Sequence, residues 1–196
     1  MFKTITPLVL ASQSPRRRQL LSQMGIEFSL TGADIEEFQL PDEKPVDFVD
    51  RMARCKALEV VSSYPESWIL AADTIVVLDQ ETLGKPIDEA EACDMLARLS
   101  GRWHQVLTAF TLHHQAMAKT ITRIDFSRVK IVPLDAVTIA AYVNSGEPLD
   151  KAGSYAVQGI GGAFVEAIDG SPTNVIGLPL PLVIRELLNN HIIALR

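Results

Sequence analysis

The sequence contains few cysteines, little positive charge and no long hydrophobic run. Its two cysteines, Cys55 and Cys93, lie in segments predicted to be helical and show no Cys/His spacing suited to zinc. We therefore expect packed thiols in a reducing compartment. The net charge of −6 disfavours broad binding to nucleic acid or to an anionic membrane. The N-terminal apolar run is too short for a signal peptide, and nothing approaches a transmembrane span, so we expect a cytoplasmic protein.

Several catalytic motifs are also missing from the sequence. There is no Walker A phosphate loop and no G-x-S-x-G motif of a serine hydrolase. The glycines of residues 159–162 precede a predicted strand instead of a helix, which makes them a poor dinucleotide fingerprint. His113 and His114 are adjacent on a predicted strand, where their rings point to opposite faces and cannot chelate one metal together.

The 196 residues, with 47% hydrophobic and 21% charged side chains, suit one soluble domain, or one domain with a small lobe. Helical and strand patterns are interspersed, and the middle of the chain reads as an antiparallel hairpin. This arrangement predicts an α/β (α+β) fold with a mixed, twisted β-sheet flanked by helices. The expected strands cover residues 7–11, 27–32, 68–78, 104–113, 120–132 and 163–168, and the expected helices cover residues 15–24, 46–62, 88–99, 135–144 and 177–190.

A serine-rich turn followed by three arginines joins the first expected strand to the first expected helix, at residues 12–18. Ser14 suits the N-cap, and Pro15 suits the first helical position. Free backbone N–H groups, the positive end of the helix dipole and guanidinium groups such as that of Arg16 therefore converge there, as in phosphate sites. A solvated basic helix start is the alternative. Arg17 falls on the apolar face of the helix, however, and this placement favours a bound phosphate.

Asp73 lies in the middle of a continuous apolar run, residues 68–78, which reads as a strand covered on both faces. An ionised carboxylate in that position costs several kcal/mol unless it is paired or binds a metal. The alternative is a bent strand in which Asp73 caps a turn. A carboxylate at the edge of a hydrophobic wall can hold a hard cation, orient water or act as a general base. Asp73 is therefore our candidate catalytic residue.

Two lysines extend this candidate site. Lys56 interrupts the apolar stripe of the helix expected over residues 46–62. Its ammonium either snorkels to solvent or reaches into a cleft and meets a phosphate or Asp73. Lys85 lies in the turn Gly84–Pro86 directly after the Asp73 strand, and a lysine in a turn is usually solvated.

Two further residues come from irregular segments. Glu37 lies in an acidic loop, which is usually soluble surface, although a second carboxylate near Asp73 would complete a Mg²⁺ or Mn²⁺ site. Gln158 stands among glycines, which permit close approach to a flat ligand, and its amide can read the edge of a base.

Taken in order, these blocks resemble the Maf family of nucleoside triphosphate pyrophosphatases from Leu8 to about Leu188. The matching blocks are Ser12–Arg17, Arg54–Ala57, Ala72–Thr74, Gly84–Pro86, Leu99–Gly101, Gly146–Gly153 and Asn174–Leu180. Two departures from the family pattern are Thr108-Ala109, where Thr-Gly is usual, and Pro172-Thr173. The resemblance implies an architecture like that of the inosine triphosphate pyrophosphatases (Maf/Ham), with a central cleft. It also implies a single domain over residues 1–196, with two lobes around the cleft as an option.

The resemblance further implies hydrolysis between the α- and β-phosphates of a nucleoside triphosphate, with a divalent cation, Mg²⁺ or Mn²⁺. Residues 150–159 look like the branch that acts on dTTP and UTP, and modified pyrimidine nucleotides remain open as substrates. By motif position, the catalytic base is Asp73, and the metal ligands are Asp73 and Glu37. The phosphate-binding residues implied are Ser14, Arg16, Arg17, Lys56 and Lys85, and those associated with substrate preference are Arg17, Thr74 and Gln158.

Two other functions stay open at this point. One is a nucleotide-binding regulator of septum formation without turnover, since the family has been linked to cell division. The other is a phosphatase that removes the terminal phosphate. The expected partner is a nucleoside triphosphate, with neither nucleic acid nor membrane. Apolar residues near Phe110 and Phe126 serve either the core or a homodimer.

Overall fold

The computed structural model describes all residues 1–196 and divides into two compact units. Unit 1 comprises residues 1–73, 108–125 and 177–196, and unit 2 comprises residues 74–107 and 126–176. The chain passes from one unit to the other within three long strands and once more before the final helix.

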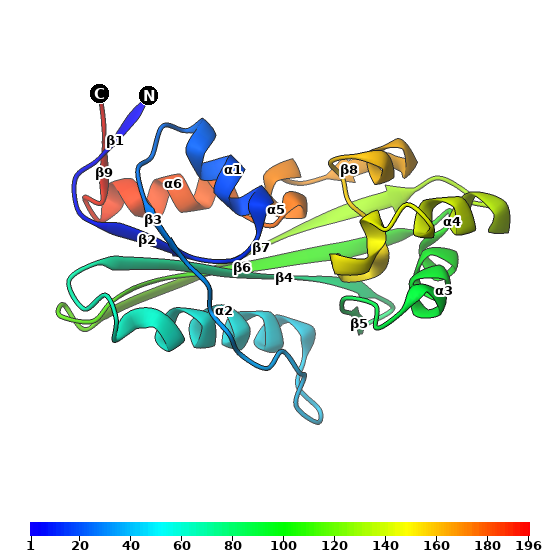
Figure 1. The fold of residues 1–196 in the computed structure, drawn as a ribbon, viewed down its shortest axis with the longest axis horizontal. Coiled ribbons are helices and arrows are strands. Elements are labelled where there is room, and N and C mark those ends of the chain that lie inside the picture. The colour runs from blue at the N-terminus through cyan, green and yellow to red at the C-terminus, as the bar shows by residue number, and fades with distance from the viewer. The chain divides into compact units, whose positions relative to one another are not determined.

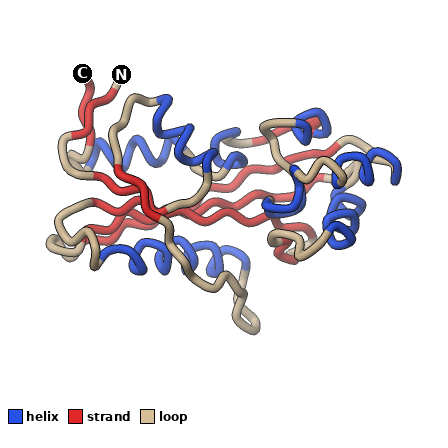
Figure 2. The backbone as a smooth tube through the Cα atoms, viewed as in Figure 1, coloured by secondary structure: helices blue, strands red, loops and turns tan.

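The structure has nine strands, six α-helices and three short 3₁₀ helices, and Figures 1 and 2 show how they are arranged within each unit. The strands are β1 (Phe2–Thr4), β2 (Leu8–Ala11), β3 (Ser29–Thr31), β4 (Trp68–Leu78), β5 (Glu81–Leu83), β6 (Trp103–His114), β7 (Lys119–Ile131), β8 (Val165–Asp169) and β9 (Ile193–Leu195). The helices are α1 (Pro15–Gln23), α2 (Pro45–Val61), α3 (Glu89–Leu99), α4 (Ala136–Val143), α5 (Pro172–Ile176) and α6 (Leu180–Asn189). The 3₁₀ helices are η1 (Glu147–Asp150), η2 (Ala152–Ser154) and η3 (Ile160–Phe164). The larger sheet has the strand order β3-β2-β4-β6-β7-β8, with β5 paired to β4.

In unit 1, strand β2 is buried along its whole length because it pairs in parallel with both β3 and β4. Helix α2 covers one face of these strands, and Figure 1 shows α1 and α6 on the other side. The α2 contact is a tight cluster of small and branched residues, Val9, Ala11, Ala57, Val60, Val61, Ile69 and Ala71. Apolar side chains on both faces of β2 and β4 thus fix where α2 lies. That helix carries Lys56.

The two ends of the chain meet in unit 1. Strands β1 and β9 form a separate antiparallel pair, in which Phe2 lies opposite Leu195 and Thr4 opposite Ile193. Figure 1 shows both termini side by side at this pair. The C-terminal strand is therefore an integral part of the unit that contains the N-terminus.

In unit 2, helices α3 and α4 pack against one face of the strands through a second core, which includes Val76, Leu96, Val106, Val129 and Tyr142. The expected start of α3 is confirmed: the Asp88 carboxylate accepts the Glu91 N–H at 2.8 Å, and the Glu91 carboxylate accepts the Ile87 N–H at 2.6 Å. These reciprocal bonds satisfy N–H groups that the first helical turn leaves unpaired.

The mixed sheet flanked by helices is confirmed, because β2 pairs in parallel with its neighbours whereas β7 and β8 pair antiparallel. Three strands of three residues each, β1, β5 and β9, were not expected, because such short segments carry too little pattern. The last helix begins at Leu180 and not at 177, because Gly177 has a φ of +119° and Pro179 occupies the N-cap. None of the helices is both long enough and apolar enough to cross a lipid bilayer.

Gly153 offers a test of the packing in unit 2. It has a φ of +68°, and a Cβ there would lie 2.8 Å from Cγ2 of Val76. We expect Gly153→Ala to lower the free energy of unfolding by about 2–4 kcal/mol, from the left-handed backbone and the crowding together.

Gly84→Ala is the matched control, since the Gly84 carbonyl accepts the Gly153 N–H but a Cβ at Gly84 meets nothing within 4 Å. Urea denaturation of both variants measures the difference. An equal loss of unfolding free energy in the two variants would show that the left-handed backbone and the crowding at Gly153 do not contribute to stability.

Candidate active site

Lys56 and Asp73 form a buried ion pair in unit 1. The Lys56 Nζ lies 2.7 Å from Oδ1 of Asp73, and the two residues are 8% and 5% exposed. Lys56 sits on the buried face of α2, and Asp73 lies within β4, which stays a strand through that position. The expected encounter of Lys56 with Asp73 is therefore confirmed, and the lysine does not snorkel to solvent. The pair satisfies the carboxylate that the apolar strand would otherwise leave unpaired.

Glu37 approaches the same ammonium from the long irregular segment between β3 and α2, drawn as a loop in Figure 2. Its Oε1 lies 2.7 Å from the Lys56 Nζ, and its side chain is 38% exposed. Two carboxylates, one buried and one partly open to solvent, thus converge on one point. The structure brings together the two residues that the sequence suggested as metal ligands.

The start of α1 has the expected cap. Ser14 is the N-cap, its hydroxyl accepts the Arg17 N–H at 3.5 Å, and Pro15 occupies the first turn. The Arg17 side chain is half-buried, with its Nε donating to the Gly177 carbonyl at 2.7 Å and its Nη1 donating to the Ser12 hydroxyl at 3.4 Å. These two bonds fix the direction of the guanidinium.

Arg17 belongs electrostatically to the cluster around Asp73. Burial lowers the pKa of the Arg17 guanidinium, the nearby Asp73 and Glu37 carboxylates oppose that shift, and Arg16 adds to it. Because the ordinary pKa of arginine is far above neutrality, the group remains charged. The cluster contains the cations of Arg16, Arg17 and Lys56 and the carboxylates of Asp73 and Glu37. It therefore carries one more positive than negative charge. Such a cluster favours an anionic ligand.

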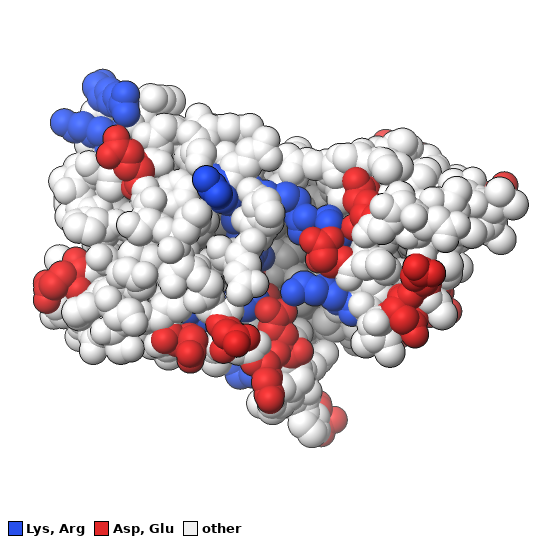
Figure 3. Space-filling model, in the orientation of Figure 1, with Lys and Arg blue, Asp and Glu red and all other residues white.

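On the face drawn in Figure 3, acidic side chains gather beside basic ones over the loop before α2 and over α2 itself, in the orientation of Figure 1. The ion pairs there include Arg51 with Glu43 and Arg54 with Asp50, both at 2.6 Å. Arg54 and Asp50 are 47% and 30% exposed, which marks this pair as a solvated contact of little energetic weight. The Lys56–Asp73 pair differs from the Arg54–Asp50 pair because both of its charged groups are removed from solvent.

The remaining predicted residues, Thr74, Lys85 and Gln158, lie in unit 2. Thr74 follows Asp73 in β4 and is half-buried, whereas Lys85 and Gln158 are exposed. The Gly84 carbonyl accepts the Gly153 N–H at 3.0 Å, which holds the turn bearing Lys85 beside the segment that leads to Gln158. The predicted site residues are thus divided between the two units.

Two contacts of this site were not predicted from the sequence. The Ser12 hydroxyl accepts hydrogen bonds from the Ser14 N–H and from the Arg17 guanidinium. The carbonyl of Gly177, 160 residues away in the sequence, accepts another from Arg17. The serine of the S-x-S-P-R-R block was a usable signal for Ser12. A backbone carbonyl has no sequence signal of its own.

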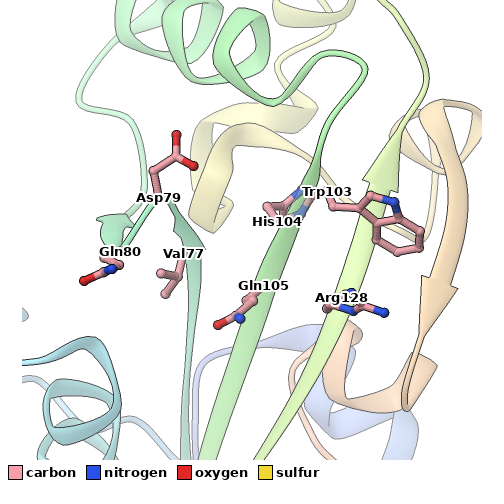
Figure 4. Close-up of a pocket in the computed structure, with 7 residues that line it drawn as sticks. All are labelled: Val77, Asp79, Gln80, Trp103, His104, Gln105 and Arg128. Atoms are coloured by element: carbon pink, nitrogen blue, oxygen red, sulfur yellow. The ribbon is translucent and has the colours of Figure 1, made fainter.

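Unit 2 also contains a pocket of about 350 Å³ that includes none of the predicted residues. Figure 4 shows its lining side chains, which lie on β4, β6, β7 and the turn between β4 and β5: Val77, Asp79, Gln80, Trp103, His104, Gln105 and Arg128. Its charged groups already have partners, since Arg102 binds Asp79 at 2.7 Å and the Arg128 guanidinium stacks 5.3 Å from the centre of the Trp103 ring. We assign no ligand to this pocket.

Comparison with known proteins identifies the family. Residues 7–190 match the model of the Maf-like protein family, and the chain belongs to that family. A dTTP/UTP pyrophosphatase of Desulfotalea psychrophila is 46% identical over 195 residues, covering 100% of both chains. A dTTP/UTP pyrophosphatase of Myxococcus xanthus is 50% identical over 175 residues, covering 89% of this chain and 88% of the relative. Among solved structures, the Staphylococcus aureus Ham1 protein aligns with a TM-score of 0.45 at 15% identity, over 64% of this chain and 71% of that one.

The energetic weight of the buried pair can be measured with Lys56→Met. Removal of the ammonium leaves two carboxylates close together, one of them buried, so we expect a loss of about 3–5 kcal/mol in the free energy of unfolding.

Arg54→Met, on the same helix, removes the exposed pair with Asp50 and should cost less than about 1 kcal/mol. Chemical denaturation at neutral pH compares the two variants. A similar loss of unfolding free energy in both variants would mean that burial does not make the Lys56–Asp73 pair more important for stability than the exposed pair.

Proposed function

We propose that this chain is a nucleoside triphosphate pyrophosphatase that hydrolyses dTTP and UTP, and modified pyrimidine nucleotides of the same type, to a monophosphate and pyrophosphate. The observation that carries the proposal is the buried Asp73 carboxylate, paired with Lys56 at 2.7 Å within a cluster that includes Arg17. Two relatives that cover 100% and 89% of this chain are named dTTP/UTP pyrophosphatases. This is a hydrolase reaction on an acid anhydride.

The phosphate tail binds at the start of α1 in this proposal. Arg16 and Arg17 supply guanidinium groups, and Ser14 at the N-cap supplies its hydroxyl. Lys56 and Lys85 neutralise the remaining negative charge. Support comes from the excess positive charge around Arg17 and from the bonds to Ser12 and Gly177 that fix its guanidinium before substrate arrives. A group fixed in advance loses little freedom on binding.

Asp73 orients the attacking water and accepts its proton. Its position in β4 and its bond to Lys56 hold the carboxylate in one place, as a general base requires. Phosphoryl transfer depends mainly on positioning and electrostatic stabilisation, with little covalent chemistry from the protein. The cationic side chains stabilise the charge that develops on the phosphates and on the pyrophosphate leaving group.

A divalent cation, Mg²⁺ or Mn²⁺, fits the carboxylates of this site. Asp73 and Glu37 each place an oxygen 2.7 Å from the same nitrogen, so both reach toward one point. The structure contains no group of three or more His, Cys, Asp or Glu side chains placed to hold a metal. Two carboxylates completed by water and substrate phosphates are, however, a common way to bind Mg²⁺. A cation bound there would be held by Asp73 and Glu37 and would polarise the substrate phosphate.

Substrate preference is the task of Arg17, Thr74 and Gln158. Gln158 is exposed in unit 2, and its amide carries both donors and an acceptor, which can match the edge of a pyrimidine. Arg17 belongs to the charged cluster around Asp73. Thr74 directly follows Asp73 in β4. Each relative named above is called a dTTP/UTP pyrophosphatase, which supports a pyrimidine preference.

The cellular setting belongs to the same proposal. The unpaired cysteines Cys55 and Cys93 suit a reducing cytoplasm, where the enzyme would clear unwanted nucleotides from the pool. Of the two hairpin residues, Phe110 is confirmed as a core residue at 0% exposure, but the expectation of a core position is wrong for Phe126, which is 69% exposed. Phe126 is therefore the hairpin residue that supports a homodimer.

The decisive test incubates the protein with dTTP and Mg²⁺ and identifies the products. We expect dTMP and pyrophosphate. Asp73→Asn should lower kcat by about 10²–10⁴-fold, the usual contribution of a general base.

Asp50→Asn is the matched control, because it makes the same chemical change at a carboxylate on the outer face of α2 and should leave the rate unchanged. Release of inorganic phosphate would indicate a terminal phosphatase instead. Nucleotide binding without turnover would indicate a regulator, and near-normal hydrolysis by a folded Asp73→Asn variant would remove Asp73 from the reaction.

A further inference from the structure

The carboxylate of Glu147 holds the glycine-rich segment that follows Gln158. Its Oε1 accepts the Ile160 N–H at 3.0 Å, and its Oε2 accepts the Gly161 N–H at 2.8 Å. Both bonds join residues of unit 2 that lie more than ten positions apart in the sequence. Glu147 begins η1, so the bonds attach the η3 segment to the element that precedes it.

Tyr142 extends this contact to the other side of Gln158. Its hydroxyl donates to Oε2 of Glu147 at 2.7 Å and accepts the Ala156 N–H at 3.2 Å. The Tyr142 ring is 2% exposed and packs edge-on against Phe164 at 5.1 Å. Tyr142 and Glu147 therefore tie the backbone to the core two residues before Gln158 and again two and three residues after it.

The glycines of this segment are required by the same contacts. Gly159 has a φ of +99°, and a Cβ there would collide with Oε1 of Glu147. A Cβ on Gly161 would collide with the Tyr142 hydroxyl and lie 2.6 Å from the Ala156 carbonyl oxygen. The segment can approach Glu147 and Tyr142 only because these positions lack side chains.

The charge states suit these bonds. Burial works to raise the pKa of Glu147, but the hydrogen bonds from Gly161, Tyr142 and Ile160 outweigh it and lower that pKa below its ordinary value. Burial raises the pKa of Tyr142, and the bond to Glu147 raises it further. At neutral pH an ionised carboxylate therefore accepts from a protonated hydroxyl.

We propose that Glu147 and Tyr142 are positioning residues for base selection: they hold the segment around Gln158 in one conformation, so that its amide favours uracil and thymine over cytosine. This inference rests on the proposed function. Uracil offers a donor at N3 and an acceptor at O4, whereas cytosine offers an acceptor at N3 and a donor at the 4-amino group. A glutamine amide has both a donor and an acceptor and suits either base, depending on its orientation. A backbone fixed on both sides of Gln158 restricts that choice.

The test compares UTP with CTP, which share a sugar and a triphosphate and differ in the pyrimidine edge. Tyr142→Phe keeps the ring that packs against Phe164 and removes only the hydroxyl. We expect the ratio of kcat/KM for UTP to that for CTP to fall about 5- to 10-fold, the loss typical of one or two hydrogen bonds. The change should lie mainly in KM, because the residues that act on the phosphates are untouched. Tyr64→Phe, a tyrosine of unit 1, is the control and should leave the ratio unchanged.

A second background separates positioning from a general structural effect. In a Gln158→Ala protein the amide is gone, so adding Tyr142→Phe should change the UTP/CTP ratio less than about 2-fold. An equal change in both backgrounds, or none in either, would overturn the inference while leaving the pyrophosphatase proposal intact. If the wild-type protein hydrolyses neither nucleotide, the proposed function fails first, and the inference falls with it.

Hydrogen exchange gives a readout that needs no activity. Glu147→Gln replaces one acceptor oxygen by an amide NH₂, so the amides of Ile160 and Gly161 should exchange faster in the ligand-free variant, with the rest of unit 2 unchanged. Unaltered exchange at both amides would show that Glu147 does not hold the segment, and this too would overturn the inference.

Discussion

The structure of unit 1 depends on the ion pair between Lys56 and Asp73. A carboxylate that is 5% exposed, in a strand that is otherwise almost wholly apolar, costs several kcal/mol unless a cation meets it. That cation reaches it only if α2 packs on β2 and β4, which the cluster of Ala57, Ile69 and Ala71 ensures. Because an apolar pair of similar volume is often at least as stable as a buried ion pair, stability alone does not account for these charges. The catalytic role proposed above for Asp73 would give a reason to keep them.

The two units contribute different kinds of chemistry. Unit 1 gathers formal charge: guanidinium groups at the start of α1, an ammonium from α2 and two carboxylates. In unit 2, besides Lys85, the neutral polar side chain of Gln158 stands on a segment that Glu147 and Tyr142 hold in place. Charges act over several ångströms, which suits a triphosphate tail that any nucleotide shares. Recognition of one base requires hydrogen bonds of fixed direction, and a restrained backbone provides them.

The parts of this site that the sequence predicted are those that break a pattern. Asp73 interrupts an apolar strand and Lys56 interrupts an apolar helical stripe, so both were visible as buried charges that needed partners. Ser14 was visible because capping is local. The contact of Arg17 with the Gly177 carbonyl was not, since it joins residues 160 positions apart through a backbone group that every residue carries. Strands β1 and β9 were missed for a related reason, because each exists only through pairing with the other. The role of Glu147 depends on bonds between irregular segments, where no periodicity applies.

The division of unit 1 into three separate stretches of chain has a consequence for biosynthesis. Strand β1 is translated before the other strands described here, yet it pairs with β9, which is translated after all of them. Every residue of unit 2 has been made by position 176, so that unit is complete earlier. Arg17 likewise waits for Gly177 before its guanidinium is held. When all residues of unit 2 have been translated, unit 1 therefore still lacks strand β9, and the Arg17 guanidinium still lacks its contact with Gly177.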